Sequence, residues 1–470
     1  MIIRTKDAAI EYEQDTSGVF QFTEGGPLLL LDGDPIAYSS ASACDSAEHN
    51  IKLNGTTIYT VQGGLTELYS ALGFNDYRDF GAMLESNPHI TYEKVVTSDD
   101  SRNMFHTIKA QIRKIIKRTG AGSVKVYLTD GASNFRITQE IATVLKYKGN
   151  RSSESKPQML GKARDYMVEE LGAIMCVGYE ADDALAIEHR NAWKQAMEGA
   201  TEFYAPEKVT QEQLEKKAME LSETVLCTID KDIKMVAGKF LNPDQDLGIE
   251  EIYPLGHLHL EVKSDSKKLR FNGLKGFYAQ LLLGDNCDNI SSVYFCGDTR
   301  VYEVLKDCNN EEQLFKATLR EIYQGFHREH LKTLDADIMN RVEVAINSGA
   351  HGNDNPSNRA KVKKKIKDAM DKTVAYGDKY YYHWSLFKEK EDGTVSKELI
   401  DPSDSLISSI TPVDYMIEVS RLVYMLDCYP DDSSQSHLWS FTPEMEKWAS
   451  RVVAEFEEEN LMRIHTEWVL

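Results

Sequence analysis

Residues 28–34 read LLLLDGD, an apolar run that ends in two aspartates, Asp32 and Asp34. The same arrangement recurs as VKVYLTD (124–130), VGYEADD (177–183), VLCTIDKD (225–232) and LLLGDNCDN (281–289). Each run is short, rich in leucine or β-branched residues and bounded by turn formers, which is typical of buried parallel strands. In an open α/β sheet, the carboxyl ends of such strands line the ligand crevice. We therefore expect an α/β fold whose acidic residues converge on one cleft.

Such a cluster of carboxylates requires a counter-charge. Two carboxylates about 4 Å apart repel each other by roughly 4 kcal/mol at an effective dielectric constant of about 20. A larger cluster must therefore bind cations or take up protons. Oxygen ligands without His or Cys favour magnesium or manganese over zinc. Two such ions about 3.5–4 Å apart support in-line phosphodiester hydrolysis, so the pattern predicts a metal-dependent nuclease.

Each acidic position also has a simpler structural interpretation. An acidic residue after a strand is often only a turn former or a helix cap. Glu180, Asp182 and Asp183 in particular could complement the dipole of a helix that begins there. The recurrence of the pattern at five strand ends is harder to explain by capping alone.

The composition of the whole chain sets further bounds. The chain has 470 residues, 41% of them hydrophobic, and a formal net charge of −21. The net charge affects solubility and long-range electrostatic steering, and it does not exclude a local basic patch. The seven cysteines form no CxxC pair, which is typical of reduced thiols in a cytoplasm-like compartment. The chain shows no signal-peptide core and no run of 18 apolar residues. We expect a cytoplasmic protein, inside a host cell if it is viral, without a membrane partner.

Several segments outside the acidic runs have recognisable patterns. Residues 104–118 predict an amphipathic basic helix, either packed on the sheet or in contact with DNA. Residues 45–100 are a polar elaboration, and residues 188–222 contain a charged helical insertion. Residues 300–345 and the regions 412–427 and 443–465 are also expected to be helical. The strongest basic run, RAKVKKKIK (359–367), is either a solvated face or a phosphate-backbone contact through Lys363, Lys364 and Lys365.

Six motifs occur in the order found in 5′-nucleases of the flap endonuclease family. They are LLLLDGD, LTD, KYKGNR (146–151), YEADDALA (179–186), TIDKDIKMV (228–236) and LLLGDNCDNI (281–290). The chain resembles this family over about residues 28–305, and the bacteriophage 5′→3′ exonucleases most closely. The resemblance implies a PIN-like α/β core with a mainly parallel sheet flanked by helices. It places this core in residues 1–290 and a helical duplex-binding region in 291–350, and gives no role to the C-terminal extension, 351–470.

The resemblance also implies a pair of Mg²⁺ ions, for which Mn²⁺ can substitute. One ion would be held by Asp32, Asp130, Glu180 and Asp182, with Asp182 also counted as catalytic. Asp183, Asp230 and Asp232 would hold the other ion or bridge the two, with Asp285 and Asp288 as further ligands, some of them through water. Asp34 lies where the family pattern is loose, and we interpret it as a helix cap before Pro35.

Other motif positions match residues that contact the nucleic acid. Lys148 and Arg151 would hold the scissile phosphate as charge develops on it. Tyr147 would stack on an end nucleotide. Gly297, Thr299 and Arg300 would contact the phosphates of the duplex, although the glycine pair usual in that turn is missing.

The activity implied is that of a magnesium-dependent 5′→3′ exonuclease on duplex, nicked or flapped DNA. Its expected setting is phage DNA replication, primer removal or DNA degradation. The short segment between KYKGNR and YEADDALA favours exonuclease over flap endonuclease action. Ribonuclease H-like cutting of an RNA–DNA hybrid and an association with replication proteins stay open.

Two other classes compete with the exonuclease interpretation. One is a catalytically idle module that binds branched DNA. The other is a haloacid-dehalogenase-like phosphatase, which LLLLDGDP fits superficially, although the expected Thr after the second aspartate is absent and KYKGNR stays unexplained. Serine hydrolases and P-loop nucleotidases are excluded, because the chain contains neither GxSxG nor GxxxxGK[ST].

Overall fold

The computed structural model describes most of the chain in two compact units. Unit 1 comprises Met1–Ala132, Ser152–Asp230 and Gly238–Glu251, and unit 2 comprises Ser133–Arg151, Lys231–Ala237 and Ile252–Leu470. The described residues are 4–6, 9–11, 20–98, 100–139, 141–150, 156–263, 266–347, 355–370, 387–389, 395–399, 410–430 and 438–467. Each unit combines segments that are distant in the sequence. The domain boundaries expected at residues 290 and 350 stay a prediction.

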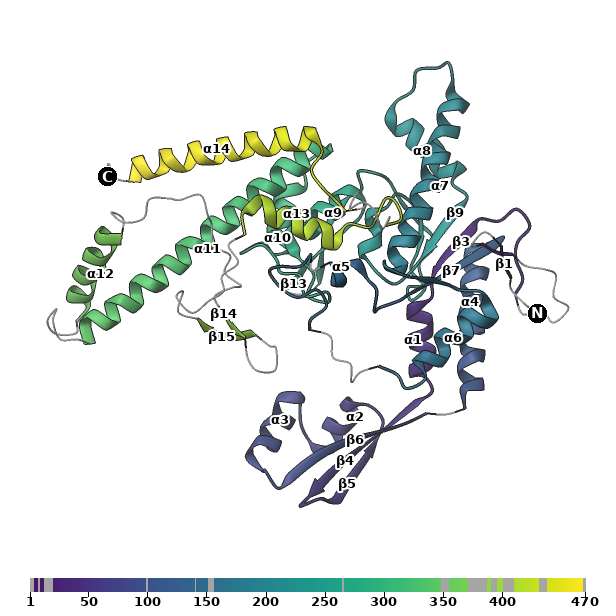
Figure 1. The fold of residues 1–470 in the computed structure, drawn as a ribbon, viewed down its shortest axis with the longest axis horizontal. Helices are drawn as coiled ribbons and strands as arrows, with labels where there is room; N and C mark the ends of the chain where they lie inside the picture. Colours follow the sequence, from purple (N-terminus) through teal and green to yellow (C-terminus); the bar gives the residue numbers. More distant parts are fainter. Residues whose placement is uncertain are drawn as a thin grey trace. The chain divides into compact units, whose positions relative to one another are not determined.

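Unit 1 is built on a mainly parallel sheet (Figure 1). In spatial order its strands are β1 (Arg4–Lys6), β2 (Ala9–Glu11), β7 (Ser123–Thr129), β3 (Leu28–Asp32), β9 (Thr224–Cys227), β10 (Gly238–Leu241) and β11 (Glu250–Ile252), with β8 (Ile174–Cys176) beside β7. The strand β3 lies between β7 and β9 and runs parallel to both. The predicted α/β class with a mainly parallel sheet is therefore confirmed.

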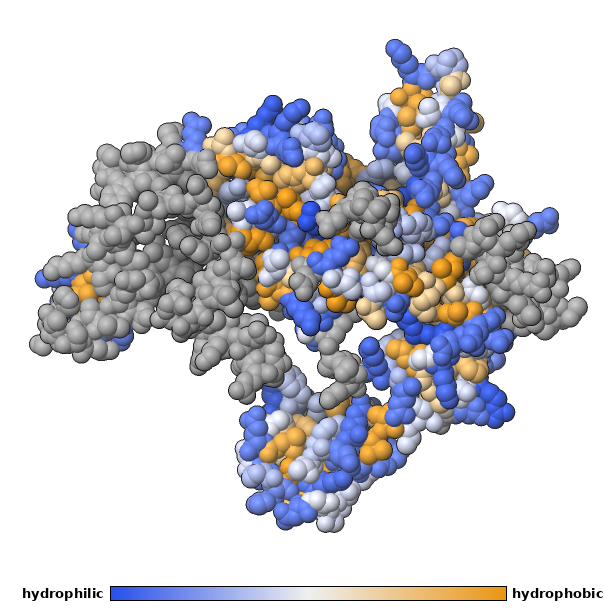
Figure 2. All heavy atoms as spheres, viewed as in Figure 1, coloured by the Kyte–Doolittle hydropathy of each residue, from blue (hydrophilic) through white to orange (hydrophobic). Residues whose placement is uncertain are grey.

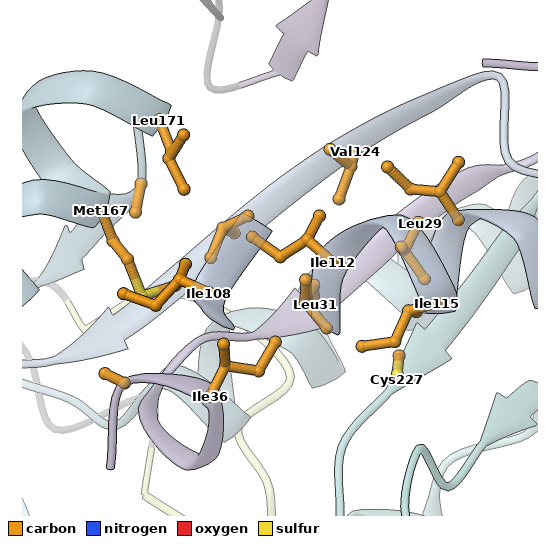
Figure 3. Close-up of a cluster of buried hydrophobic side chains, with 14 of the residues drawn as sticks. Leu29, Leu31, Ile36, Ile108, Ile112, Ile115, Val124, Met167, Leu171 and Cys227 are labelled. Atoms are coloured by element: carbon orange, nitrogen blue, oxygen red, sulfur yellow. The ribbon is translucent and has the colours of Figure 1, made fainter. Parts of the chain in front are cut away.

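Helices cover the sheet because β3 is apolar on both faces. Leu29 and Leu31 enter a core shared with α1 (Asp34–Ser42), α4 (Ser101–Thr119) and α6 (Leu160–Leu171), shown in Figure 3. Leu30 is also fully buried, and the alternation along a strand turns it to the opposite face. The helix α7 (Ala181–Tyr204) packs against the same strands. The uninterrupted leucine run thus indicates a strand that is buried on both faces.

The helix α4 confirms the amphipathic helix predicted over residues 104–118. Its apolar face is buried, and it includes Met104, Ile108 and Ile112. The helix begins after Asp100, whose side chain accepts a hydrogen bond from the Arg102 backbone N–H, and it ends at Gly120. The burial of this face supports the first of the two interpretations, a helix packed on the sheet.

Residues 45–98 are more than a polar elaboration. They form an antiparallel sheet of β4 (Asp45–Leu53), β5 (Thr56–Gln62) and β6 (Ile90–Ser98), with β4 in the centre, and two helices, α2 (Leu65–Leu72) and α3 (Tyr77–Ser86). Ile51, Leu68 and Phe80 form its separate core. The high polar content hid this module in the sequence, because β5 and β6 are largely exposed.

The helical insertion predicted at 188–222 is the long helix α7 followed by α8 (Gln211–Leu221). The two helices contact each other through Ala196, Ala200 and Ala218. Both carry many hydrophilic side chains on the face seen in Figure 2. Small residues on the contact face let the two backbones approach closely while the charged residues stay in solvent.

Unit 2 is mainly helical. Its elements are α5 (Phe135–Thr138), the short 3₁₀ helix Asp232–Met235, the hairpin β12 (Leu258–Lys263) and β13 (Ser266–Phe271), α9 (Gly273–Leu283), α10 (Asp298–Leu305), α11 (Glu311–Asn347), α12 (Pro356–Met370), the hairpin β14 (Phe387–Glu389) and β15 (Val395–Leu399), α13 (Pro412–Val423) and α14 (Pro443–Glu467). The helices predicted over 300–345 and in the two C-terminal regions are confirmed.

The C-terminal helices of unit 2 pack on helices that precede them by about 100 residues. Tyr415 of α13 contacts Phe326 of α11, with ring centroids 5.6 Å apart. Trp448 of α14 contacts Phe315 of α11 at 5.7 Å. The extension beyond residue 351 thus contributes large aromatic side chains to the core of unit 2. No helix in the described part of the chain is long and apolar enough to cross a bilayer.

His189 is a buried titratable group in the core of unit 1. Its Nδ1 lies 2.8 Å from Oγ1 of Thr224, and its Nε2 faces Gly238. Gly238 has φ +133°, and a Cβ there would lie 2.1 Å from Nε2. Burial lowers the pKa of His189 to about 4, with Arg190 and Lys239 adding to the effect. The imidazole is therefore neutral in the folded protein at neutral pH.

This neutral histidine predicts acid sensitivity. The unfolded chain protonates His189 near pH 6.5, so its contribution to stability is present above that pH and is lost as pH falls towards 4. Between pH 7.5 and pH 5 we expect the free energy of unfolding to drop by about 2 kcal/mol from this group. Urea unfolding of wild type and His189→Gln at both pH values measures it. A stability difference between the two proteins that does not change with pH would contradict the prediction.

Candidate active site

The carboxyl ends of β3 and β9 bring Asp32 and Asp230 together through one threonine. Asp32 is 7% exposed, and its Oδ2 accepts a hydrogen bond of 2.8 Å from Oγ1 of Thr228. The same hydroxyl oxygen accepts the backbone N–H of Asp230 at 3.1 Å. Because β3 and β9 are adjacent and parallel, both aspartates emerge at the same edge of the sheet.

The first turn of α7 brings further carboxylates to this edge. Glu180 is the N-cap residue, and Oδ2 of Asp183 accepts its backbone N–H at 3.1 Å. Asp183 is fully buried, so part of the capping interpretation is correct for this motif. Asp182 does not take part in that hydrogen bond. Its Oδ1 is buried and has no hydrogen-bond partner within the described residues.

Burial and neighbouring carboxylates raise the pKa values of two of these side chains. Burial raises the pKa of Asp182 well above its usual value, and the charges of Asp32, Asp230 and Glu180 raise it further. Burial and the charge of Asp34 raise the pKa of Asp32 to about 7, with Asp230 adding to the effect, although the hydrogen bond from Thr228 opposes it. The edge of the sheet is therefore short of positive charge. We call Asp32, Glu180, Asp182 and Asp230 the carboxylate cluster.

Asp34 does not cap α1, and this expectation was wrong. The N-cap residue is Gly33, and no side chain caps the helix. Oδ2 of Asp34 instead accepts the backbone N–H of Thr129 at 2.8 Å, and Oδ1 pairs with Arg164 of α6. Arg164 also donates to the Thr129 carbonyl. No local pattern predicts this, because the partners lie far apart in the sequence and meet only through the sheet.

Asp130 follows β7 at the same edge, where it forms local backbone contacts. Its backbone N–H donates to the carbonyl of Cys176 at 2.9 Å, and its Oδ1 accepts the backbone N–H of Ala132 at 3.4 Å. These contacts are typical of a turn-forming aspartate. A metal-binding role for Asp130 stays a prediction.

The carboxylate cluster has the donor chemistry of a hard cation site. In the parts of the chain that the structure describes, no three His, Cys, Asp or Glu side chains are already arranged as metal ligands. The cluster nevertheless offers only oxygen donors, including the unpartnered buried Oδ1 of Asp182. Burial and the charge of Asp183 raise the pKa of nearby Cys176 to about 12, so that thiol stays protonated. Oxygen donors without thiolate suit Mg²⁺ or Mn²⁺.

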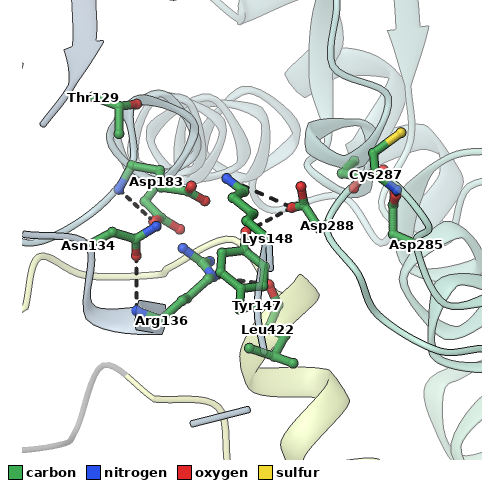
Figure 4. Close-up of polar contacts among 12 residues, drawn as sticks. Thr129, Asn134, Arg136, Tyr147, Lys148, Asp183, Asp285, Cys287, Asp288 and Leu422 are labelled. Carbon is green, nitrogen blue, oxygen red and sulfur yellow. Dashed lines mark hydrogen bonds and ion pairs between the residues drawn. The ribbon is translucent and has the colours of Figure 1, made fainter. Parts of the chain in front are cut away.

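A second group of predicted residues lies within unit 2, where two loops are joined by hydrogen bonds (Figure 4). The Tyr147 hydroxyl donates to Oδ2 of Asp288 at 2.8 Å, and the Lys148 backbone N–H donates to the Asp288 carbonyl at 2.9 Å. Nζ of Lys148 lies 3.9 Å from the same Oδ2 and 4.9 Å from the centre of the Tyr147 ring. The side-chain amides of Asn150 and Asn289 donate to carbonyls of the opposite loop. We call residues 143–150 and 284–291 the paired loops.

The backbone of the paired loops is strained at the candidate catalytic lysine. Lys148 has φ +55° and Asn289 has φ +60°, both in the left-handed region. Such a conformation costs about 1–3 kcal/mol in a residue other than glycine and persists where surrounding contacts enforce it. The hydrogen bonds between the loops provide this enforcement. The backbone of Lys148 is thus held by the opposite loop, and its Nζ lies near Asp288 of that loop.

Tyr147 is only 5% exposed. Stacking on a nucleotide would require the ring to leave its buried position and the hydroxyl to leave Asp288. The structure instead gives Tyr147 a supporting contact beneath Lys148. Arg151, the second predicted phosphate-binding cation, lies outside the described residues.

Asp232 and Asp285 share a lysine that the sequence analysis did not single out. Nζ of Lys231 lies 2.8 Å from Oδ2 of Asp285 and 3.4 Å from Oδ1 of Asp232. Burial raises the pKa of Asp285, but the hydrogen bond and charge of Lys231 outweigh it, so the net pKa is lowered. In the sequence, Lys231 lies between the two aspartates of TIDKD. This position in the motif is the only sequence feature that could have indicated its contact with the site aspartates.

The residues predicted to contact the duplex are divided between two helices. Gly297 is the N-cap residue of α10, which places Thr299 and Arg300 in its first turn. The Arg300 guanidinium pairs with buried Glu321 at 2.6 Å, so part of its charge is already neutralised. Lys363 and Lys364 lie on α12, and the Lys365 side chain is outside the described part. Duplex contact by these residues stays a prediction.

Comparison with known proteins adds little. No family model and no curated protein matches the chain. Two solved structures of the bacteriophage T5 D15 protein are similar, one crystallised with metal ions and one a flap endonuclease complex with DNA and metal ions. Both are 16% identical and cover 57% of this chain, with TM-scores of 0.27 and 0.26; the match spans 93% and 91% of those chains. Such TM-scores are too low to establish a shared fold.

The crowded cluster predicts that removing one charge stabilises the metal-free protein. The pKa of Asp32 is raised to about 7, so its contribution to stability is present below the unfolded value near 4 and is lost as pH rises through 7. At pH 8 in EDTA, Asp32→Asn should raise the free energy of unfolding by up to about 4 kcal/mol. Magnesium should stabilise wild type and have a smaller effect on the variant. Thermal unfolding with and without magnesium measures both effects.

The matched control is Asp165→Asn, which neutralises an exposed aspartate of α6 in the same unit. This variant should behave like wild type in both conditions. Destabilisation by Asp32→Asn at pH 8, or an undiminished effect of magnesium, would contradict the prediction.

Proposed function

We propose that this chain is a divalent-metal-dependent nuclease whose first metal site is the carboxylate cluster. The observation that supports it most directly is the buried Oδ1 of Asp182, which has no hydrogen-bond partner within the described residues and belongs to a side chain whose pKa is raised by burial and by the charges of Asp32, Asp230, Glu180 and Asp183. An unpaired buried acceptor among like charges is costly unless a cation or a proton compensates it. A hard divalent ion would compensate the negative charge without protonating the carboxylates, which would stay available as metal ligands.

Within this proposal Asp32, Glu180, Asp182 and Asp230 hold the ion, and Asp130 joins them. Such an ion supplies activated water and support for a leaving oxygen. Thr228 orients Asp32 and Asp230, while Asp34 and Arg164 hold the ends of β7 and α6 beside them. The second ion, with Asp183, Asp230, Asp232, Asp285 and Asp288, stays a sequence-based proposal, in which Asp230 bridges the two ions.

We further propose that the substrate is DNA and that the reaction is 5′→3′ exonucleolytic. The order of the acidic motifs, with KYKGNR between the second and third of them, supports this choice. The strands β3, β7, β8 and β9, which precede four of the acidic motifs, agree with a PIN-like core, whereas the apolar run before Asp285 was expected to be a strand and is the C-terminal end of α9. Lys148 is proposed to bind the scissile phosphate, since its ammonium group is held in place and remains partly exposed. Arg151 is proposed to assist it.

The phosphatase alternative is disfavoured by the environment of Asp34. In that class the second aspartate of the motif must exchange a proton with the substrate. Here its carboxylate accepts the backbone N–H of Thr129 and is paired with the Arg164 guanidinium, so both of its oxygens are already engaged in structural contacts. The idle DNA-binding module stays as the alternative that the activity assay decides.

The nuclease proposal is tested with 5′-labelled and 3′-labelled nicked, blunt and flapped duplexes, in magnesium or in EDTA. We expect magnesium-dependent release of short 5′ products, and we expect Asp182→Ala to abolish cleavage while binding to the duplex persists. Asp165→Ala, at an exposed position, is the matched control. Full activity in Asp182→Ala would refute the assignment, and tight binding without cleavage by wild type in either metal would favour the idle module.

Lys148→Ala separates binding from chemistry. Because one cation that stabilises developing charge contributes about 10²–10³-fold to the rate, we expect the single-turnover rate to fall by about 100-fold. Affinity for the duplex should change little. Lys146→Ala removes an exposed lysine of the same loop and should leave both values unchanged. A loss confined to affinity would show that Lys148 only attracts DNA.

A further inference from the structure

Helix α13 carries a buried acidic side chain that binds the backbone of one of the paired loops. Glu418 lies in the middle of this helix and is 8% exposed. Its Oε1 accepts the backbone N–H groups of Thr143 at 3.0 Å and Val144 at 3.1 Å, and its Oε2 accepts the Thr143 hydroxyl. A buried carboxylate is tolerated only when it is well hydrogen-bonded. All three donors come from the loop that leads to Lys148.

One helical turn earlier, Tyr415 reaches the other paired loop. Its ring is fully buried against Phe326, and its hydroxyl donates to the carbonyl of Ser291 at 2.9 Å. Residues three apart on a helix lie on the same face. One face of α13 thus contacts both paired loops, through Glu418 and Tyr415.

A buried arginine fixes the position of α13 itself. Arg136 is 2% exposed, and its Nε and Nη2 donate to the carbonyls of Leu422 and Tyr424 at 3.0 Å and 2.9 Å (Figure 4). These are carbonyls at the C-terminal end of α13, where a cation is favourable. The guanidinium also stacks on Phe135 at 4.5 Å. The end of the helix is therefore anchored to the segment that precedes the first paired loop.

These contacts surround the pair formed by Lys148 and Asp288. Glu418 holds the chain four and five residues before Lys148, and Tyr415 holds it three residues after Asp288. The left-handed backbone of Lys148 needs such enforcement on both sides. Without Glu418, the backbone N–H groups of Thr143 and Val144 would lose their acceptor. The loop would then be free to relax towards an unstrained conformation.

We propose that Glu418, in the C-terminal extension, is a positioning residue that sets the location of the Lys148 ammonium group. This inference rests on the proposed function, in which Lys148 contacts the scissile phosphate. It gives α13 a role in the reaction that the nuclease motifs could not indicate, because none of them lies in this helix. Glu418 acts through the hydrogen bonds that it accepts from Thr143 and Val144, and its role is therefore positioning and not catalytic.

The test compares Glu418→Ala, Glu418→Gln and Thr143→Ala in single-turnover cleavage by the full-length protein with magnesium. We expect Glu418→Ala to lower the rate by about 10- to 100-fold with little change in affinity, since small misplacements of a reacting group have effects of this size. Glu418→Gln keeps an acceptor oxygen for the two backbone N–H groups and should restore most of the rate. Thr143→Ala removes one hydroxyl contact and should have a smaller effect. Glu444→Gln, at an exposed position of α14, is the control.

A double variant separates positioning from general packing. If Glu418 acts through Lys148, adding Glu418→Ala to Lys148→Ala should lower the rate less than two-fold further. Fully multiplicative losses would overturn the proposal, as would a rate for Glu418→Ala equal to that of wild type.

Hydrogen exchange provides a readout that does not depend on activity. In Glu418→Ala the amides of Thr143, Val144 and Lys148 should exchange at least 10-fold faster, while the amides of α9 keep their protection. Unchanged exchange in the loop would overturn the proposal, and global loss of protection would show a purely structural role. An inactive wild type would refute the proposed function, and the exchange data would still decide whether Glu418 holds the Lys148 loop.

Discussion

Repulsion among buried carboxylates is the constraint on which the candidate site of unit 1 depends. The strand β3 is buried on both faces, so Asp32 emerges from the sheet with little access to water. The neighbouring strand and the start of α7 bring Asp230 and Asp182 to the same edge. The fold stabilises these groups only in part, through Thr228 and backbone donors. Such an arrangement lowers stability and is retained where a ligand compensates it.

In unit 2, contacts from two loops and from α13 surround the cationic residue Lys148. Lys148 has a strained backbone and a long flexible side chain, so its ammonium group is fixed only by its surroundings. Asp288 and Tyr147 lie beside it, and α13 supports the backbone of the loop that leads to it. Buried Glu418 and Arg136 both act on backbone groups and form no ion pair with each other in the described contacts. Hydrogen bonds to backbone give geometric precision, because the backbone has little freedom once its donors are satisfied.

Local pattern was a good guide where the physical cause was itself local. The leucine run before Asp32 predicted a buried strand, and the periodicity of residues 104–118 predicted α4, because burial directly sets both patterns. The module of residues 45–98 was missed, since its exposed strands have a polar composition. Asp34 was misassigned for a related reason. A capping position is recognisable in sequence, but the competing partner Arg164 is brought near only by the packing of α6.

The sequence by itself determined the class of the fold, the strand ends that bear Asp32, Asp130 and Asp230, and the hard-oxygen character of the candidate site; the strand expected before Asp285 is instead the end of helix α9. These properties depend on residue type and on spacing along a single element. Only the tertiary structure decided which carboxylate oxygen lacks a partner, that Tyr147 is buried, that Lys231 lies between Asp232 and Asp285, and that α13 supports the Lys148 loop. Each of these depends on contacts between segments distant in the chain. No local pattern specifies them, because the packing of whole elements sets such distances.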